Sequence, residues 1–250
     1  ADLQALSDSD GDDTNDLTAL VDKAVSDFGT ALSDIQAYAG DDGTPAGSTA
    51  PVEADYVSLG VDPTLAGDTG LLDSVNTVLA SGPVEGNDTD NTGEADVSTA
   101  AKVKDLFSHY DAIRTANGDG SLGLTQSQYE ALGLGDPVNF GSNPGEKLAL
   151  LNGVLDDRSG ADTANVDTWD KLRGLASTVD ELIASAASGT KSTSLDESAL
   201  VEAGFGGVTA DNLDAVLQAI ADSDPADLQA LSDSDGDDTN DLTALVDKAV

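Results

Sequence analysis

The chain begins and ends with one stretch of sequence: residues 1–25 read ADLQALSDSDGDDTNDLTALVDKAV, and residues 226–250 repeat them letter for letter. The second copy starts at residue 226, so the offset between the copies is 225 residues. An identity of this length does not arise by chance and indicates a tandem repeat with that period. We expect the chain to be one repeat and the start of the next, taken from a longer array. An engineered duplication is the alternative, and it would also imply a tandem unit.

Both copies end inside a helical pattern. Apolar residues recur every three or four positions from Leu17 to Ile35, which predicts a helix that ends near Tyr38. The second copy breaks off at Val250, in the middle of this pattern. Before it, Asp224-Pro225 predicts a helix start, with Asp as the N-cap and proline in the first turn.

Three related segments divide the repeat. They read Tyr56-Val-Ser-Leu-Gly-Val61, Tyr129-Glu-Ala-Leu-Gly-Leu134 and Leu200-Val-Glu-Ala-Gly-Phe205. Their first residues are 73 and 71 positions apart, and adding the period of 225 to position 56 gives a third spacing of 81. Each segment predicts a short helix with a glycine at its C-terminal end. A medium helix, a polar loop, a long helix and a polar linker are expected to follow each time.

Helix signals recur along the rest of the chain. The expected helices and start signals are residues 55–61, 69–80 and 96–116, the capping boxes Thr125–Gln128 and Ser194–Glu197, Asn143-Pro144, Thr209, and the apolar pattern from Trp169 to Ile183. A polar loop is expected over residues 157–165. No segment alternates with period two for long enough to suggest a strand, so we predict an all-α fold.

The segments predict a tandem array of small helical units. Residues 1–55 would end one unit, residues 56–128 and 129–199 would form two units, and residues 200–250 would start the next. Units of about 75 residues are near the lower size limit for an independent core, so neighbouring units are expected to pack on one another or on other chains. Small bundles separated by linkers, such as residues 40–54, are the alternative.

The composition is strongly acidic. The chain has 48 acidic and 10 basic residues, a formal net charge of −38. Nucleic acid and anionic membrane surfaces are therefore not expected as partners, and the chain repels itself unless cations are present. With no Cys and no Met, it has neither disulfides nor thiolate metal sites, and no run of about 18 apolar residues predicts a membrane span. The expected partners are copies of the chain and cations.

One candidate Ca²⁺ site lies in a loop that resembles an EF-hand or dockerin-type loop. Asn117 and Asp119 match the third and fifth positions, and Ser121 matches the seventh, which ligates through its carbonyl. Thr115 and Gln126 stand where that loop has its first Asp and its bidentate Glu. One carboxylate remains, so we expect weak affinity, and a helix C-cap followed by a turn is the alternative.

The duplicated stretch holds the second candidate Ca²⁺ site. Its carboxylates are Asp8, Asp10, Asp12, Asp13 and Asp16, and residues 233–241 repeat them. Clustered carboxylates suit a hard cation, although the glycine is misplaced for an EF-hand. A solvated loop with helix caps is the alternative, because Asp is favoured in caps and turns.

No constellation predicts an enzyme. His109 is the one histidine and is expected to face solvent, and no residue is marked as a nucleophile by a surrounding motif. Trp169 is expected to anchor the core rather than to bind sugar. No phosphate-binding glycine loop with its Lys is present.

The Tyr56-x-x-Leu-Gly-Val61 pattern and residues 209–220 (TADNLDAVLQAI) resemble helical repeats of very long secreted and surface proteins of Gram-negative bacteria, including giant RTX-exported adhesins. The resemblance implies an extracellular or cell-surface stalk, often in Ca²⁺-rich surroundings, and no catalytic residue. We therefore expect a structural segment that extends from a cell or builds a fibre. A repeat that binds glycan or protein by avidity is the alternative.

Overall fold

The computed structural model describes residues 16–39, 49–81, 97–116, 122–134, 138, 140–161, 166, 168–230 and 242–249. These residues are mostly helical and include no strand, which confirms the predicted all-α class. In chain order the helices are α1 (Asp16–Tyr38), α2 (Glu53–Ser58), α3 (Pro63–Ala66), α4 (Thr69–Ser81), α5 (Ala100–Thr115), α6 (Gln126–Ala131), α8 (Pro144–Ala161), α9 (Trp169–Ser188), α10 (Glu197–Glu202), α11 (Leu213–Ala221), α12 (Pro225–Ala230) and α13 (Leu242–Ala249).

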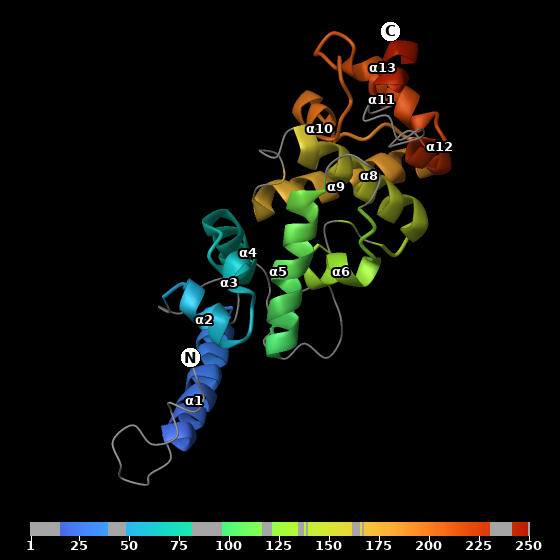
Figure 1. Cartoon of the computed structure of the whole chain (residues 1–250). Coiled ribbons are helices and arrows are strands. Elements are labelled where there is room, and N and C mark those ends of the chain that lie inside the picture. The colour runs from blue at the N-terminus through green and yellow to red at the C-terminus, as the bar shows by residue number, and fades with distance from the viewer. Residues whose placement is uncertain are drawn as a thin grey trace.

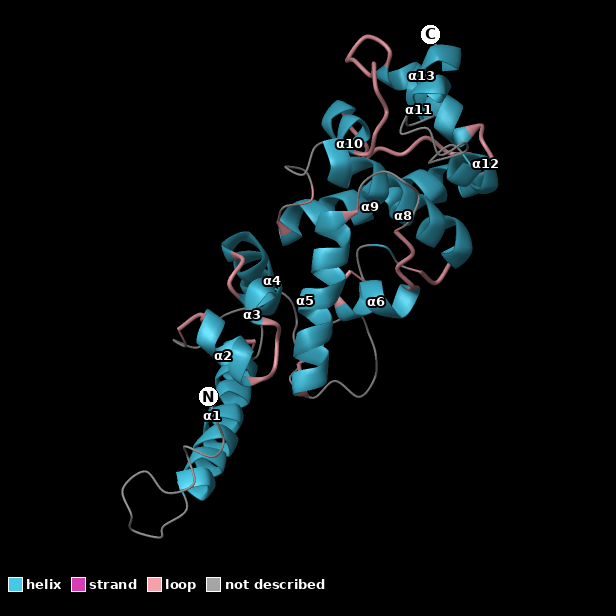
Figure 2. Ribbon diagram, viewed as in Figure 1, coloured by secondary structure: helices cyan, strands magenta, loops and turns pink. Residues whose placement is uncertain are grey.

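The molecule is elongated. Figure 1 shows α1 projecting from one end, with α11 and α13 at the other end and α5, α8 and α9 between them. Figure 2 shows the same arrangement as helices joined by loops. The N-terminal helix and the C-terminal copy of its sequence therefore lie at opposite ends.

Helices α2, α6 and α10, called the short helices below, end in the same way. Each is followed by a glycine in the left-handed region: Gly60 with φ 84°, Gly133 with φ 73° and Gly204 with φ 100°. The amide after each glycine donates to the carbonyl five residues back, from Val61 to Tyr56 (3.1 Å), Leu134 to Tyr129 (3.0 Å) and Phe205 to Leu200 (2.9 Å). This is the Schellman motif, so the predicted glycine caps are confirmed.

Several helix starts are also as predicted. Helices α1 and α4 cover the expected residues. Asp224 Oδ1 accepts the Ala226 amide at 2.9 Å, which caps α12, and the Gln128 side chain accepts the Thr125 amide at 2.8 Å, the return bond of a capping box.

Three predicted helix starts were wrong. Helix α5 begins at Ala100 rather than near residue 96, and Thr99 caps it. The N-cap of α10 is Asp196 rather than Ser194, because the Asp196 carboxylate accepts the Ala199 amide at 2.9 Å. Helix α11 begins at Leu213 rather than Thr209, since Asn212 accepts the Thr209 amide and holds residues 209–212 in a turn.

The predicted start of the polar loop, residue 157, was also wrong. Helix α8 continues to Ala161. Asp156 is 2% exposed and accepts the Leu122 amide at 3.1 Å, so this carboxylate is satisfied inside the fold and does not end the helix.

Candidate assembly surface

The long helices α5 and α9, called the linking helices below, each contact two successive groups of helices. Helix α5 packs on α4, which precedes it, and on α6 and α8, which follow it. Helix α9 packs on α8 before it and on α10 and α11 after it. Each linking helix therefore joins a middle helix (α4 or α8) to the next short helix (α6 or α10).

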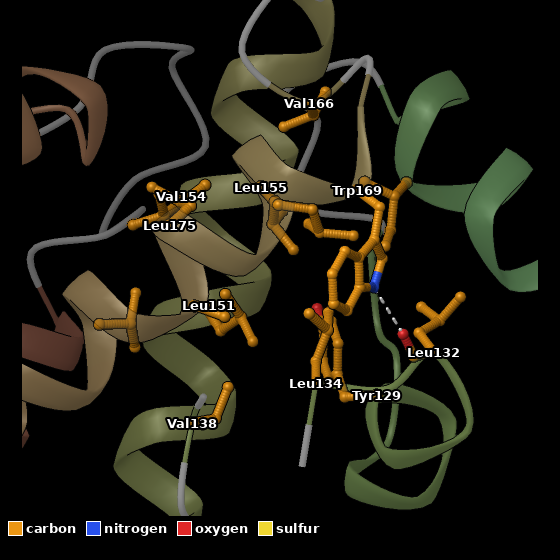
Figure 3. Close-up of a cluster of buried hydrophobic side chains, with 14 of the residues drawn as sticks. Tyr129, Leu132, Leu134, Val138, Leu151, Val154, Leu155, Val166, Trp169 and Leu175 are labelled. Carbon is orange, nitrogen blue, oxygen red and sulfur yellow. Dashed lines mark hydrogen bonds between the residues drawn. The ribbon is translucent and has the colours of Figure 1, made fainter. Parts of the chain in front are cut away.

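The first residue of α9 fixes this linking helix in the core. Trp169 is 2% exposed, and its Nε1–H donates to the Leu132 carbonyl at the end of α6 over 3.0 Å. Figure 3 shows this bond beside the buried side chains of α8 and α9. The Arg173 guanidinium covers the ring at 5.3 Å from its centroid. Trp169 is thus the predicted core anchor.

A tyrosine–asparagine network ties a short helix to a middle helix twice. Tyr56 of α2 donates its hydroxyl to Asn76 of α4 at 2.5 Å, and Tyr129 of α6 donates to Asn152 of α8 at 2.7 Å. Both rings are fully buried, and burial raises the pKa of both hydroxyls, so each stays a protonated donor. The sequence pattern marked both tyrosines but gave no sign of their asparagine partners.

An ion pair crosses from α8 to α9. Lys147 Nζ lies 2.5 Å from Asp180 Oδ1, and the lysine side chain is 3% exposed. A buried ammonium needs such a partner, because the desolvation cost of an isolated charge is large. The pair therefore fixes the relative position of these two helices.

Helix α1 has two unlike halves. Its C-terminal half packs on α2, and Ala31 and Ile35 are buried, as is Ala39 directly after the helix. Gln36 also donates to the Val97 and Ser98 carbonyls, at 3.3 and 3.4 Å. Every residue from 18 to 30 is exposed. The exposed apolar side chains are Leu20 (46%), Val21 (51%), Val25 (67%) and Phe28 (40%), which we call the α1 apolar face.

Helix α13 repeats the sequence of α1 from Leu17 to Ala24 but is packed differently. It lies on α11, and Leu242 (0%), Leu245 (8%) and Val246 (3%) are buried. The Gly206 amide also donates to Thr243 Oγ1 at 3.1 Å.

Residues 17–24 and 242–249 are therefore helical in both copies, but the described side chains have different environments. Leu245 and Val246 are the counterparts, 225 positions later, of the exposed Leu20 and Val21. Because the sequences are identical, the difference comes from the neighbours: α11 and the turn at Gly206 cover α13.

The predicted Ca²⁺ ligands lie largely outside the described residues. This applies to Asn117, Asp119 and Ser121 and to Asp8, Asp10, Asp12 and Asp13. Asp16 begins α1, but its side chain is also outside the described part. Within the described ranges, no group of three or more His, Asp or Glu side chains could hold a metal ion.

His109 is half-buried on α5, so the expectation that it faces solvent was wrong in part. Its Nδ1 atom is buried without a hydrogen-bond partner. Burial lowers the pKa of the imidazole, and the charge of Asp105 partly opposes this shift.

One surface groove lies between α1 and α2. It is lined by Asp34, Ala37, Pro51, Val52 and Asp55, with neighbours at residues 49 and 50. The Asp55 carboxylate already accepts the Val52 amide at 2.9 Å, as part of the α2 cap. This groove therefore offers little chemistry beyond holding the two helices.

Comparisons with protein-family models, curated proteins and solved structures found no match to the chain. In the part of the chain that the structure describes, no helix is long and apolar enough to cross a membrane.

Proposed function

We propose that the chain is a structural segment of a giant extracellular protein, in which tandem helical units form a fibre, filament or surface stalk. The single observation that carries this proposal is the packing of the linking helices. Helices α5 and α9 each contact the helices before and after them, so successive units share their cores. Units that share cores extend along one direction, as in solenoid proteins.

The recurring local structure supports the same units. Three short helices carry the same Schellman end, and two of them hold the same tyrosine–asparagine network. We place the units at residues 56–128 and 129–199, with residues 1–55 ending one unit and residues 200–250 starting another. Repetition at 225 residues would then add a constant length per repeat.

The acidic composition suits a scaffold that stays dissolved outside a cell. A net charge of −38 repels neighbouring molecules and draws cations to the surface. Ca²⁺ at the acidic loops would reduce the repulsion between successive units. The rings of Trp169, Tyr56 and Tyr129 are buried, which disfavours the alternative of a glycan-binding repeat that stacks sugars on them.

Electron microscopy of the purified protein, with and without a chelator, tests the proposal. We expect uniform extended particles or fibres. Their loss in chelator would support structural Ca²⁺, and their persistence would count against it. Compact round particles in both conditions would overturn the structural proposal.

A further inference from the structure

We propose that the α1 apolar face docks on α11 of a second copy of this repeat, in the place that α13 holds here. The docking site is the surface of α11 together with the turn at Gly206 and Gly207. The inference rests on the proposed function and adds the surface by which one repeat meets the next.

Sequence identity supports this choice of partner. In α13 the residues Leu242, Leu245 and Val246 are buried on α11. Helix α1 carries the same residues at positions 17, 20 and 21, with identical residues between them. A surface that accepts α13 therefore accepts α1 through the same contacts.

The turn before α11 fits the same helix closely. A Cβ atom at Gly206 would lie 2.9 Å from Thr243 Oγ1, and one at Gly207 would lie 3.8 Å from Val246. The absence of a side chain at Gly206 thus allows the repeated helix to approach the backbone, whereas a Cβ at Gly207 would make only ordinary van der Waals contact. Thr18 is the counterpart of Thr243 and would accept the same hydrogen bond from Gly206.

The linking helices show what the joined arrangement would be. Both α5 and α9 contact a middle helix before them and a short helix after them. Helix α1 makes the second kind of contact, to α2, and α13 makes a contact of the first kind, to α11, the helix that follows the short helix α10 as α4 and α8 follow α2 and α6. If α1 docked on α11 of another copy, α1 would make both kinds of contact, as α5 and α9 do.

The ends of the molecule are placed for this contact. Helix α1 and the α11–α13 pair lie at opposite ends of the elongated molecule (Figure 1). Contacts between unlike ends are heterologous, so they continue from copy to copy and generate a filament rather than a closed dimer.

Within one chain, α13 competes for the site at a high effective concentration. The test therefore weakens α13 in the full chain with Leu245→Asp and Val246→Asp. We expect this variant to associate, with a mass by light scattering at least twofold that of the unchanged chain at the same concentration. Adding the matched pair Leu20→Asp and Val21→Asp should restore the single-chain mass. Equal masses for the two variants would overturn the proposal.

A milder pair of changes keeps the test valid if circular dichroism shows that the first variant has lost helices other than α13. Leu245→Ala and Val246→Ala then weaken α13, and Thr18→Cys with Gly206→Cys reports docking, because the chain has no other cysteine. We expect disulfide-linked dimers and longer species. In the control, Thr243→Cys with Gly206→Cys should form a disulfide within one chain. If the control closes and the Thr18 variant links no chains, the proposal fails.

The two proposals fail separately. Extended particles by electron microscopy without α1 docking would leave the structural function standing and remove only this inference. Docking between chains that form only compact particles would remove the structural function.

Discussion

The two tyrosine–asparagine networks predict unequal losses of stability when their asparagines are truncated. Asn152 holds three groups: the Tyr129 hydroxyl at 2.7 Å, the Leu124 amide at 3.1 Å and the Leu124 carbonyl at 2.9 Å. Asn76 holds two, the Tyr56 hydroxyl at 2.5 Å and the Pro51 carbonyl at 3.0 Å, because proline has no amide hydrogen to donate.

The magnitude follows from the number of bonds lost. One intramolecular hydrogen bond contributes about 1 kcal/mol net to the free energy of unfolding, and more when a buried partner is left unsatisfied. Asn152→Ala should therefore cost about 3 kcal/mol and Asn76→Ala about 2 kcal/mol. Both asparagines are half-buried and lose the same atoms, so the apolar part of the change is matched.

Urea unfolding followed by far-UV circular dichroism measures both variants. Fluorescence of Trp169 follows the region of Asn152, because this tryptophan bonds to Leu132 at the end of α6. Tyr129→Phe and Tyr56→Phe are the controls, and each should cost about 1 kcal/mol, since each removes one bond. An equal or larger loss at Asn76 would refute the assignment of stability to these networks.

Three further changes follow from the described contacts. Gly206→Ala should loosen α13, because the new Cβ would meet Thr243 Oγ1 at 2.9 Å, and faster amide exchange in α13 would show this loosening. In contrast, Gly29→Ala should stabilise α1 by up to about 1 kcal/mol, because a Cβ at Gly29 would meet nothing within 4 Å. Burial lowers the pKa of His109, so the unfolded chain binds the proton more readily than the folded chain. The stability of the fold should therefore decrease as the pH drops below the ordinary pKa of 6.5. In His109→Gln, the melting temperature should depend less on pH in this range. Asp68 caps α4, and the hydrogen bond from the Leu71 amide holds the pKa of its carboxyl below 3.8. Asp68→Ala should lower the free energy of unfolding by about 1 kcal/mol at neutral pH, but by much less once the pH has fallen through this lowered pKa. Unchanged stability at about pH 7 would contradict the cap.

Much of the fold could be predicted because its signals are local. Apolar spacing marked α1 and α4, and a glycine in each related segment marked the ends of α2, α6 and α10. A Schellman end needs a residue that tolerates positive φ followed by an apolar residue, and the sequence shows both.

The wrong start of α10 has a local cause. Ser194 and Asp196 are both good N-caps, and sequence alone does not rank them, because neighbouring side chains compete for the same backbone amides. The fold decided in favour of Asp196, which accepts the Ala199 amide. Thr209 instead lies in the turn before α11, where the Asn212 side chain accepts its amide.

The candidate assembly surface could be predicted only in part. The repeated stretch was evident, but residues 17–24 and 242–249 are identical, so no local signal could show that Leu20 and Val21 are exposed while Leu245 and Val246 are buried. That difference depends on α11, which lies far along the chain from α1. The predicted Ca²⁺ ligands stay predictions.

Small-angle X-ray scattering of a two-repeat chain, residues 1–225 followed by residues 1–250, tests the central claim most directly. If successive repeats share a helix, the second repeat should add almost the full length of the first to the maximum dimension, and the scattering should be that of a rod. A radius of gyration that grows only as about the square root of the repeat number, as for units on flexible linkers, would contradict the account.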